Sequence, residues 1–360
     1  MEGLGTRLGA EGKVNAVVTG GNGCLGKRMV KNLVADGRYK VHSLDLRIPR
    51  EEDRSPEVCS YIQADITNRD DLIVALRESS QVDAVFHVAS IIPHRIGFTV
   101  EDFNRINTNG TKNVLEACQE CGVKRLIYTS SASVVLSKDH FEIIDNVDES
   151  YPLPSNPVNP YIASKQAAER LVRAANGKNG LLTCAMRPSG LFGGTNNATL
   201  QVLMQSWVNC YIGDGKYAIA FVPVDAAARA HILAEKKLCR EGIDSIIAGK
   251  AYNLSMNERV SLVELIKYIR KELNGRPYLS IPMWILPVAA YLNTHIHALT
   301  GIALLGDSVT TLVIDGLREH TFSSALAHRE LGWEELPTWK EFVKQYVDEY
   351  RQDMEAKKRK

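Results

Sequence analysis

The first half of the chain alternates short apolar runs with segments of helical periodicity. The apolar runs are rich in β-branched residues, as buried strands of a parallel sheet are. They occupy residues 14–19, 40–44, 60–62, 83–88, 125–130 and 182–187. Helical patterns lie between them, at residues 24–36, 69–79, 101–121 and 158–176. This alternation predicts an α/β protein with a Rossmann-type doubly wound parallel sheet, covered by helices on both faces.

The alternation becomes irregular after Arg187. Helical patterns at residues 261–273 and 338–352 indicate a smaller, mixed C-terminal domain. Residues 218–224 and 250–255 have the character of strands that return to the main sheet. We therefore expect a nucleotide-binding domain at residues 1–190, with returning elements from 218–255, and a substrate-binding domain at residues 191–360.

The composition is that of a packed globular protein. Of 360 residues, 45% are hydrophobic and 24% are charged, which excludes a disordered chain and a protein with many membrane spans. Lys and Arg number 43 against 42 Asp and Glu, so no bulk field attracts nucleic acid, and we expect no nucleic-acid partner. The seven cysteines are too few and odd in number for a disulfide framework, and the N-terminal residues lack the apolar core of a signal peptide. The catalytic part is therefore expected on the reducing, cytosolic side.

One pair of cysteines has the spacing of a metal site. Cys118 and Cys121 form a CxxC motif, but within a helical pattern and without a second pair or nearby histidines. Ordinary helix packing is the better interpretation, and we expect no metal.

A glycine-rich turn follows the first predicted strand. Gly20, Gly23 and Gly26 have the spacing GxxGxxG, with Cys24 and Leu25 opening the first helix. Small residues let the backbone approach a pyrophosphate, and the helix N-terminus offers free N–H groups to it. A tight strand-to-helix turn without any ligand is the simpler alternative.

Acidic residues after the second and third predicted strands point to a dinucleotide. Asp45 lies 19 residues after Gly26, where a carboxylate accepts hydrogen bonds from the adenosine ribose and repels a 2′-phosphate. The cofactor is therefore predicted to be NAD rather than NADP. Asp65, followed by Ile66, is a candidate partner of the adenine amino group, and an ordinary turn aspartate is the alternative.

A tyrosine and a lysine share one face of a later helix. Tyr161 and Lys165 are four residues apart, directly after Pro160, although about one such pair is expected by chance. Ser130 and Ser131 end the fifth predicted strand, where open α/β sheets bind their ligands. The pKa of free tyrosine is about 10, and a lysine cation together with a positive nicotinamide ring favours the phenolate. These residues fit hydride transfer between a secondary alcohol and NAD, with Tyr161 taking the hydroxyl proton.

Several longer segments carry a family resemblance that spans residues 14–350. They read VVTGGNGCLG, FHVAS, INTNGTKNVLEAC, LIYTSSASVV, NPYIASKQAAE, MRPSGLFG, FVPVDAAARAHILA and RELGW. With them the sequence resembles the extended short-chain dehydrogenase/reductases, and specifically the 3β-hydroxysteroid dehydrogenase family. Within that family it looks most similar to the sterol-4α-carboxylate 3-dehydrogenase (decarboxylating) branch.

The resemblance implies a role for each matching residue. Tyr161 and Lys165 match the catalytic pair, and Ser131, not Ser130, matches the active-site serine. Asn107 matches an asparagine that supports the lysine through backbone and water, although a purely structural helix asparagine is the alternative. Other matches are to segments that line the cofactor: Ala89 and Ser90 along it, Pro188 and Ser189 near the nicotinamide, and Lys165 at the nicotinamide ribose.

The function implied is NAD-dependent oxidation of a 3β-hydroxyl on a steroid or sterol. If the substrate carries a 4α-carboxylate, the product is a β-keto acid that loses CO2. Residues 254–257 read Leu-Ser-Met-Asn, without the acidic pair typical of the hormone-making, isomerising branch. Two alternatives share the cofactor motifs: a sugar-nucleotide epimerase or other extended-type NAD(P) reductase, and a non-catalytic NAD-sensing protein.

One long stretch departs from the average composition. Residues 277–306 contain no Asp, Glu, Lys or Arg, and residues 288–305 are amphipathic but too short and polar to span a bilayer. A core helix of the substrate domain fits equally, and the resemblance favours membrane association of residues 278–305. The basic end at residues 357–360 matches a dilysine retrieval signal or a solvated tail. We expect the cytosolic face of the endoplasmic reticulum membrane, with the cytoplasm as the alternative, and a homodimer.

Overall fold

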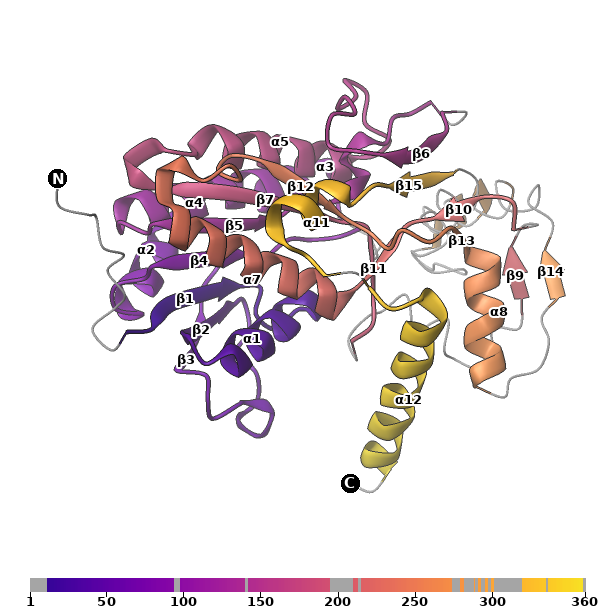
Figure 1. Ribbon diagram of the computed structural model, residues 1–360, viewed down its shortest axis with the longest axis horizontal. Coiled ribbons are helices and arrows are strands. Elements are labelled where there is room, and N and C mark those ends of the chain that lie inside the picture. The colour runs from indigo at the N-terminus through magenta and orange to yellow at the C-terminus, as the bar shows by residue number, and fades with distance from the viewer. Residues whose placement is uncertain are drawn as a thin grey trace.

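A seven-stranded parallel sheet forms the centre of the computed structural model (Figure 1). The structure describes residues 12–93, 98–139, 142–194, 210–212, 215–273, 279–281, 288, 291–292, 295–296, 299–300, 319–334 and 336–358. The strand order is β12-β7-β5-β4-β1-β2-β3. The strands are β1 (Val14–Thr19), β2 (Tyr39–Asp45), β3 (Ser60–Gln63), β4 (Ala84–His87), β5 (Arg125–Thr129), β7 (Leu182–Pro188) and β12 (Ala251–Leu254). The predicted doubly wound α/β fold is confirmed.

Helices cover both faces of this sheet (Figure 1). One face packs on α1 (Cys24–Asp36) and α7 (Val224–Glu241), the other on α2 (Arg69–Glu78), α4 (Gly110–Glu120) and α5 (Pro160–Ala175). Within β1, Ala16 and Val18 belong to the first apolar cluster and Val17 to the second. Successive strand residues are therefore buried on opposite faces, which explains the uninterrupted apolar runs in the sequence.

Two helical features differ from the pattern in the sequence. The helix expected at residues 101–121 is α3 (Val100–Phe103) and α4 joined through a π-helical turn, η2 (Asn104–Asn109). The helix α7 is not predicted by hydrophobic periodicity, because alanines such as Ala226, Ala227 and Ala230 are buried around much of its circumference. A helix that is buried almost all round shows little amphipathic contrast.

The second half of the chain contributes to the main sheet and to a smaller region beside it. Residues 250–255 contain β12, which pairs with β7, whereas residues 218–224 contain short strands outside the main sheet. A four-stranded sheet consists of β13 (Val260–Ser261), β10 (Ala218–Ile219), β15 (His320–Phe322) and β6 (Ile144–Val147), in that order. Two-stranded sheets pair β11 (Phe221–Pro223) with β8 (Gly190–Phe192), and β14 (Leu279–Ile281) with β9 (Cys210–Ile212). The remaining elements are α8 (Leu262–Glu272), α11 (Ala325–Leu331), α12 (Trp339–Lys358), η1 (Glu51–Asp53), η3 (Ala132–Val135), η4 (Lys178–Gly180) and η5 (Gly242–Asp244).

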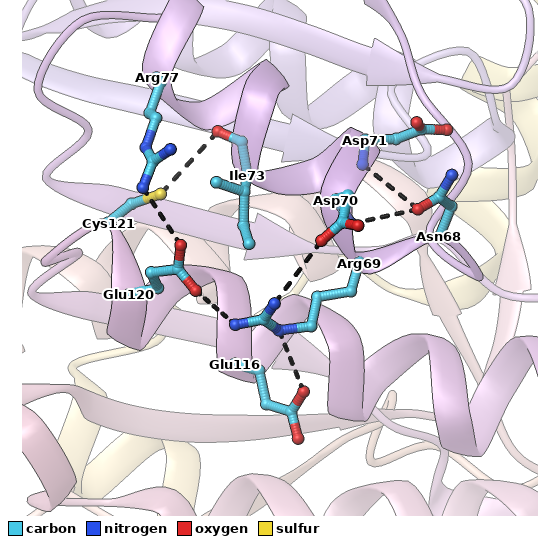
Figure 2. Close-up of polar contacts among 9 residues, drawn as sticks. All are labelled: Asn68, Arg69, Asp70, Asp71, Ile73, Arg77, Glu116, Glu120 and Cys121. Carbon is cyan, nitrogen blue, oxygen red and sulfur yellow. Dashed lines mark hydrogen bonds and ion pairs between the residues drawn. The ribbon is translucent and has the colours of Figure 1, made fainter.

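The CxxC motif lies where α2 packs against α4. Cys118 is fully buried in the apolar cluster, and the thiol of Cys121 points at the carbonyl of Ile73, with Sγ 3.9 Å from the oxygen (Figure 2). Around it, Arg77 pairs with Glu120 at 3.1 Å in a network of surface charges. Among the described residues no group of His, Cys, Asp and Glu is arranged to hold a metal. The two cysteines therefore pack between helices.

Most of the uncharged segment at 278–305 lies outside the described residues, as do residues 359–360 of the basic end. Of the segment's described side chains, Val288, Leu292 and Leu299 are exposed. No helix in the described part of the chain combines the length and the apolar character needed to cross a bilayer.

Candidate active site

At two positions of the glycine turn between β1 and α1, a Cβ atom does not fit, because neighbouring backbone atoms occupy the space. Gly20 has a φ of +71°, and a Cβ there would lie 2.8 Å from the backbone of Ala89. A Cβ on Gly26 would lie 1.9 Å from the carbonyl oxygen of Gly20. The Gly23 N–H closes the turn on the same carbonyl at 3.0 Å. Only glycine at positions 20 and 26 allows α1 to start this close to the strand.

The N-terminus of α1 is open to a ligand. Gly23 is the N-cap residue and has no side chain to satisfy the first N–H groups of the helix. Leu25 is buried in the apolar cluster beneath, while the Cys24 thiol donates to the carbonyl of Gly193 at 3.5 Å. Burial raises the pKa of Cys24 to about 11, so this thiol is protonated and unreactive at neutral pH. The first turn thus presents uncapped N–H groups that fit the pyrophosphate of a dinucleotide.

Asp45 lies beside this turn, at the end of β2. Its Oδ2 accepts the backbone N–H of Asn22 at 3.0 Å, and the N–H of Gly21 donates to the carbonyl of Leu44 at 3.2 Å. The carboxylate is half-buried and orders the glycine turn from the side where the next strand ends. The open turn and the adjacent carboxylate fit the pyrophosphate and ribose of NAD.

Asp65 and Ile66 follow β3 and have structural partners. One carboxylate oxygen of Asp65 accepts the N–H of Thr67 at 2.8 Å, as a turn aspartate does. Ile66 is buried, its carbonyl accepts from the Asn113 side chain at 3.0 Å, and its side chain packs on Gly110.

The other predicted cofactor residues lie at the carboxyl ends of β4 and β7. The N–H of Ala89 donates to the Thr19 hydroxyl at 3.3 Å, and Ser90 follows it half-buried. Pro188 ends β7, and the Ser189 hydroxyl donates to the carbonyl of Leu254 at 3.1 Å. Since β1, β2, β4 and β7 are parallel, all these residues lie along one edge of the sheet.

Tyr161 is held at the start of α5, facing the end of β5. The Asn159 side chain accepts the N–H of Ile162 at 2.9 Å and caps the helix, and Pro160 occupies its first turn. A hydrogen bond with Ser131 lowers the pKa of Tyr161, but burial outweighs it and raises the pKa to about 12. The lowered pKa expected from the sequence is therefore not provided by the groups of the chain alone.

Lys165 lies one turn further along α5 and is almost fully buried. Its Nζ donates to the carbonyl of Thr129 at 2.9 Å and lies 5.1 Å from the ring centroid of Tyr128. Burial lowers its pKa to about 7, because water no longer solvates the ammonium, and the carboxylate of Glu169 acts in the opposite direction.

Asn107 connects this helix to the loop after β4. It lies in the π-helical turn, a feature often found at functional sites. Its Oδ1 accepts the N–H of Ile91 at 2.9 Å, and its Nδ2 donates to the carbonyl of Ile91 and to the Ser164 hydroxyl, both at 3.0 Å. Ser164 donates in turn to the carbonyl of Tyr161 at 2.7 Å. These contacts match the structural alternative for Asn107, and they hold the turn that carries Tyr161.

The two serines after β5 have different surroundings. Ser131 faces Tyr161, whereas the Ser130 hydroxyl donates to Glu169 at 2.6 Å. Glu169 also binds Arg187, and neither residue was singled out from the sequence. A charged residue inside an otherwise apolar strand, as Arg187 is, was the available signal for a buried partner.

The fold and this sheet edge define a Rossmann-type oxidoreductase of the extended short-chain dehydrogenase/reductase class. A model of the 3-beta hydroxysteroid dehydrogenase/isomerase family matches residues 17–282. The chain belongs to this family, whose members are NAD-dependent oxidoreductases, so the predicted family, enzyme class and cofactor are confirmed.

Individual relatives agree with this family. The 3beta-hydroxysteroid-dehydrogenase/decarboxylase isoform 1 of Arabidopsis thaliana is 33% identical over 93% of this chain and 79% of its own length. The sterol-4-alpha-carboxylate 3-dehydrogenase, decarboxylating, of Homo sapiens is 36% identical over 74% of this chain and 69% of its own.

Solved structures share the fold at lower identity. UDP-glucose 4-epimerase of Thermotoga maritima superposes with a TM-score of 0.73 at 20% identity, covering 95% of this chain and all of that one. The Thermus thermophilus UDP-glucose 4-epimerase, in complex with NAD, gives 0.70 at 21% identity, covering 94% and 99%. At this identity the likeness extends to the fold alone.

Proposed function

We propose that this protein oxidises the 3β-hydroxyl of a steroid or sterol with NAD, and that Tyr161 is the base. The observation that carries the proposal is the grouping of three side chains at the end of β5. Tyr161 is hydrogen-bonded to Ser131, and the buried Lys165 lies one turn along the same helix. A sensor protein has no need of this combination.

The chain's own residues would divide the work as follows. Ser131 holds the substrate oxygen by a hydrogen bond, and Tyr161 accepts the hydroxyl proton as the carbinol hydrogen departs as hydride. The ammonium of Lys165 stabilises the phenolate through the field it adds to the buried site. NAD, when bound, supplies the hydride acceptor and a positive charge near the reacting oxygen.

The surroundings of Tyr161 favour an apolar substrate. The ring of Phe103 lies 6.1 Å from that of Tyr161, and the ring of Phe98 lies 6.1 Å from that of Phe103. Phe98 is more than a third exposed, so this aromatic row extends from the ring of Tyr161 towards solvent. Apolar side chains suit a sterol skeleton better than a charged nucleotide.

We further propose a 4α-carboxysterol as the preferred substrate. Oxidation at C3 then gives a β-keto acid, which loses CO2 readily, so the chain needs no machinery beyond the hydride step. The names of the plant and human relatives include this decarboxylation.

The test is NADH formation from 3β-hydroxysterols with and without a 4α-carboxylate, with products identified by mass. We expect turnover of sterols and release of CO2 only from the carboxylated ones. Conversion of UDP-glucose to UDP-galactose without any sterol turnover would establish the epimerase alternative instead. NAD binding with no turnover of either substrate would refute the proposed activity and leave the sensor and another extended-type reductase as the alternatives.

We also propose that the protein works at the cytosolic face of the endoplasmic reticulum membrane. The support is the uncharged stretch at 277–306 and the exposed side chains of Val288, Leu292 and Leu299 within it. An apolar surface of this kind suits an enzyme whose substrate dissolves in lipid.

A further inference from the structure

The helix α5 carries a buried carboxylate, Glu169, one turn beyond Lys165. Glu169 is 1% exposed, and its carboxylate accepts Nε and Nη2 of Arg187 at 2.9 and 2.6 Å. The same carboxylate accepts the Ser130 hydroxyl at 2.6 Å. Two-pronged Arg–carboxylate pairing is among the strongest and most directional of side-chain contacts.

These contacts join three elements of the active site. Ser130 directly precedes Ser131 at the end of β5, whose Thr129 carbonyl binds Lys165. Arg187 directly precedes Pro188 at the end of β7. Through Glu169, the helix that carries Tyr161 and Lys165 is thus tied to both strand ends that face the reacting groups.

Two buried cations belong to this part of the site. Arg187 and Lys165 are 2% and 1% exposed, and Nη1 of Arg187 has no hydrogen-bond partner in the described part of the chain. Arg173 on α5 approaches Glu169 at 4.0 Å, but it is half-exposed and so contributes little.

Other titratable groups around these cations come from several elements. His87 on β4 and His231 on α7 have lowered pKa values and are neutral, and the pKa values of Tyr128 on β5 and Tyr161 on α5 are raised. Glu149 also faces Arg187, and burial raises the pKa of its carboxyl. Glu169 is the carboxylate that binds Arg187 directly and acts on Lys165.

We infer that Glu169 is a positioning residue that keeps Lys165 protonated and aligned with Tyr161 while Tyr161 works as the base. This inference rests on the proposed function. Without the carboxylate, the buried ammonium of Lys165 loses the negative charge that opposes its desolvation, and its pKa falls further. At neutral pH Lys165 then becomes the neutral amine. Lys165 would then no longer stabilise the Tyr161 phenolate.

The test compares charge-removing variants by the pH dependence of kcat. Glu169→Gln keeps the shape of the side chain and the Ser130 contact but removes the charge, and we expect the alkaline limb of the profile to move to lower pH by about one unit. Arg187→Met should move it to higher pH, since Glu169 then acts on Lys165 alone. The double variant Glu169→Gln with Arg187→Met should return the alkaline limb towards its original pH. Glu169→Asp keeps the charge and should leave the alkaline limb in place.

Glu235 provides a matched control. It is fully buried on α7 and binds Arg125 at 2.8 Å and Tyr39 at 2.6 Å, away from Lys165. We expect Glu235→Gln to lower the melting temperature without moving the pH profile. If Glu169→Gln also lowers stability and leaves the profile in place, the role of Glu169 is structural and the inference fails. If Glu169→Gln does not fold, the opposite shift in Arg187→Met decides.

A second measurement needs neither substrate nor cofactor. The loss of unfolding free energy caused by Glu169→Gln should shrink as pH rises from 6 to 9, because Lys165 loses its proton in that range. In a Lys165→Met background the loss should be independent of pH. If the loss of unfolding free energy shrinks with rising pH but no sterol is turned over, the proposed function alone is refuted. If the loss is independent of pH with Lys165 present, the inference is refuted.

Discussion

Burial acts in opposite directions on Tyr161 and Lys165, two ionisable side chains of α5. It raises the pKa of Tyr161 to about 12 and lowers that of Lys165 to about 7, because the charged form of each loses water. Both shifts favour a neutral pair. The chain counters this with the Ser131 hydrogen bond on Tyr161 and the carboxylate of Glu169 near Lys165. Ser131 and Glu169 thus favour the charged forms of Tyr161 and Lys165, which burial disfavours.

Replacing the Tyr161 hydroxyl tests its assignment as base. Tyr161→Phe removes the proton acceptor and keeps the ring that contacts Phe103, so kcat should fall by about 10²–10⁴-fold. The Kd for NAD should change less than threefold, measured by fluorescence titration. Phe103→Leu, which alters the ring contact but keeps the hydroxyl, is the control. Substantial turnover by Tyr161→Phe would remove the proposed mechanism.

The cofactor preference should depend on the charge of Asp45. Asp45→Ala loses the ribose acceptor and the repulsion of a 2′-phosphate, so affinity for NAD should fall about tenfold while that for NADP rises or stays level. The ratio of the two Kd values is the measurement. Asp53→Ala, an acidic residue in η1 that pairs with Arg50, is the matched control and should leave the ratio unchanged. An unchanged ratio in Asp45→Ala contradicts the assigned role.

Two buried histidines join elements that are far apart in the sequence. The ring of His87 on β4 hydrogen-bonds Thr19 on β1 at 2.8 Å and Thr111 on α4 at 3.0 Å. The ring of His231 on α7 hydrogen-bonds Thr129 on β5 at 2.8 Å. Desolvation lowers the pKa of His87 to about 3 and that of His231 to about 4, so both are neutral in the folded protein.

These histidines predict a loss of stability in acid. Below pH 6.5 the unfolded chain binds protons that the folded protein does not, so the free energy of unfolding falls with pH. Between pH 6.5 and about 5, the loss should be roughly 2 kcal/mol per histidine, measured by urea unfolding. His231→Gln should flatten the dependence, whereas replacing the exposed His295 should not. Parallel curves for the protein and His231→Gln would show that His231 does not couple folding to pH.

At the scale of the whole molecule, the seven-stranded sheet with the candidate active site adjoins a smaller region, and the uncharged segment belongs to that smaller region. In Figure 1, α8 and α12 lie beside the main sheet rather than on its faces. They share an apolar cluster with Phe192 and Phe221, which lie on β8 and β11 outside the main sheet. The substrate side can therefore differ from that of sugar-nucleotide enzymes while the fold is shared.

Membrane binding should depend on the exposed apolar side chains at 288–299. Leu292→Asp with Leu299→Asp places charges where lipid contact is proposed, and flotation with phosphatidylcholine vesicles should fall at least about tenfold. Ile243→Asp changes an equally exposed apolar residue in η5 and should leave flotation unchanged. Equal flotation of the double variant and the parent would exclude this segment as the membrane contact.

Much of the cofactor side of the site was predictable because it is encoded locally. The glycine spacing determines a turn within seven residues, and α1 begins at Cys24 and ends at Asp36 as predicted. The four-residue spacing of Tyr161 and Lys165 places them on one helix face whatever surrounds them. Steric limits and helical periodicity act over a few residues, so the sequence by itself determined these features.

The tertiary structure decided how charges are paired and which segments complete the sheet. Glu169 and Arg187 meet only because β7 is inserted next to β5 and α5 crosses over both. For the same reason Ser130 is bound by Glu169, Asn107 holds Ile91, and β12 returns from residue 251 to pair with β7. A buried charge must find a partner, but the identity of that partner depends on which strands become neighbours. That choice arises from packing across the whole chain, which no local pattern contains.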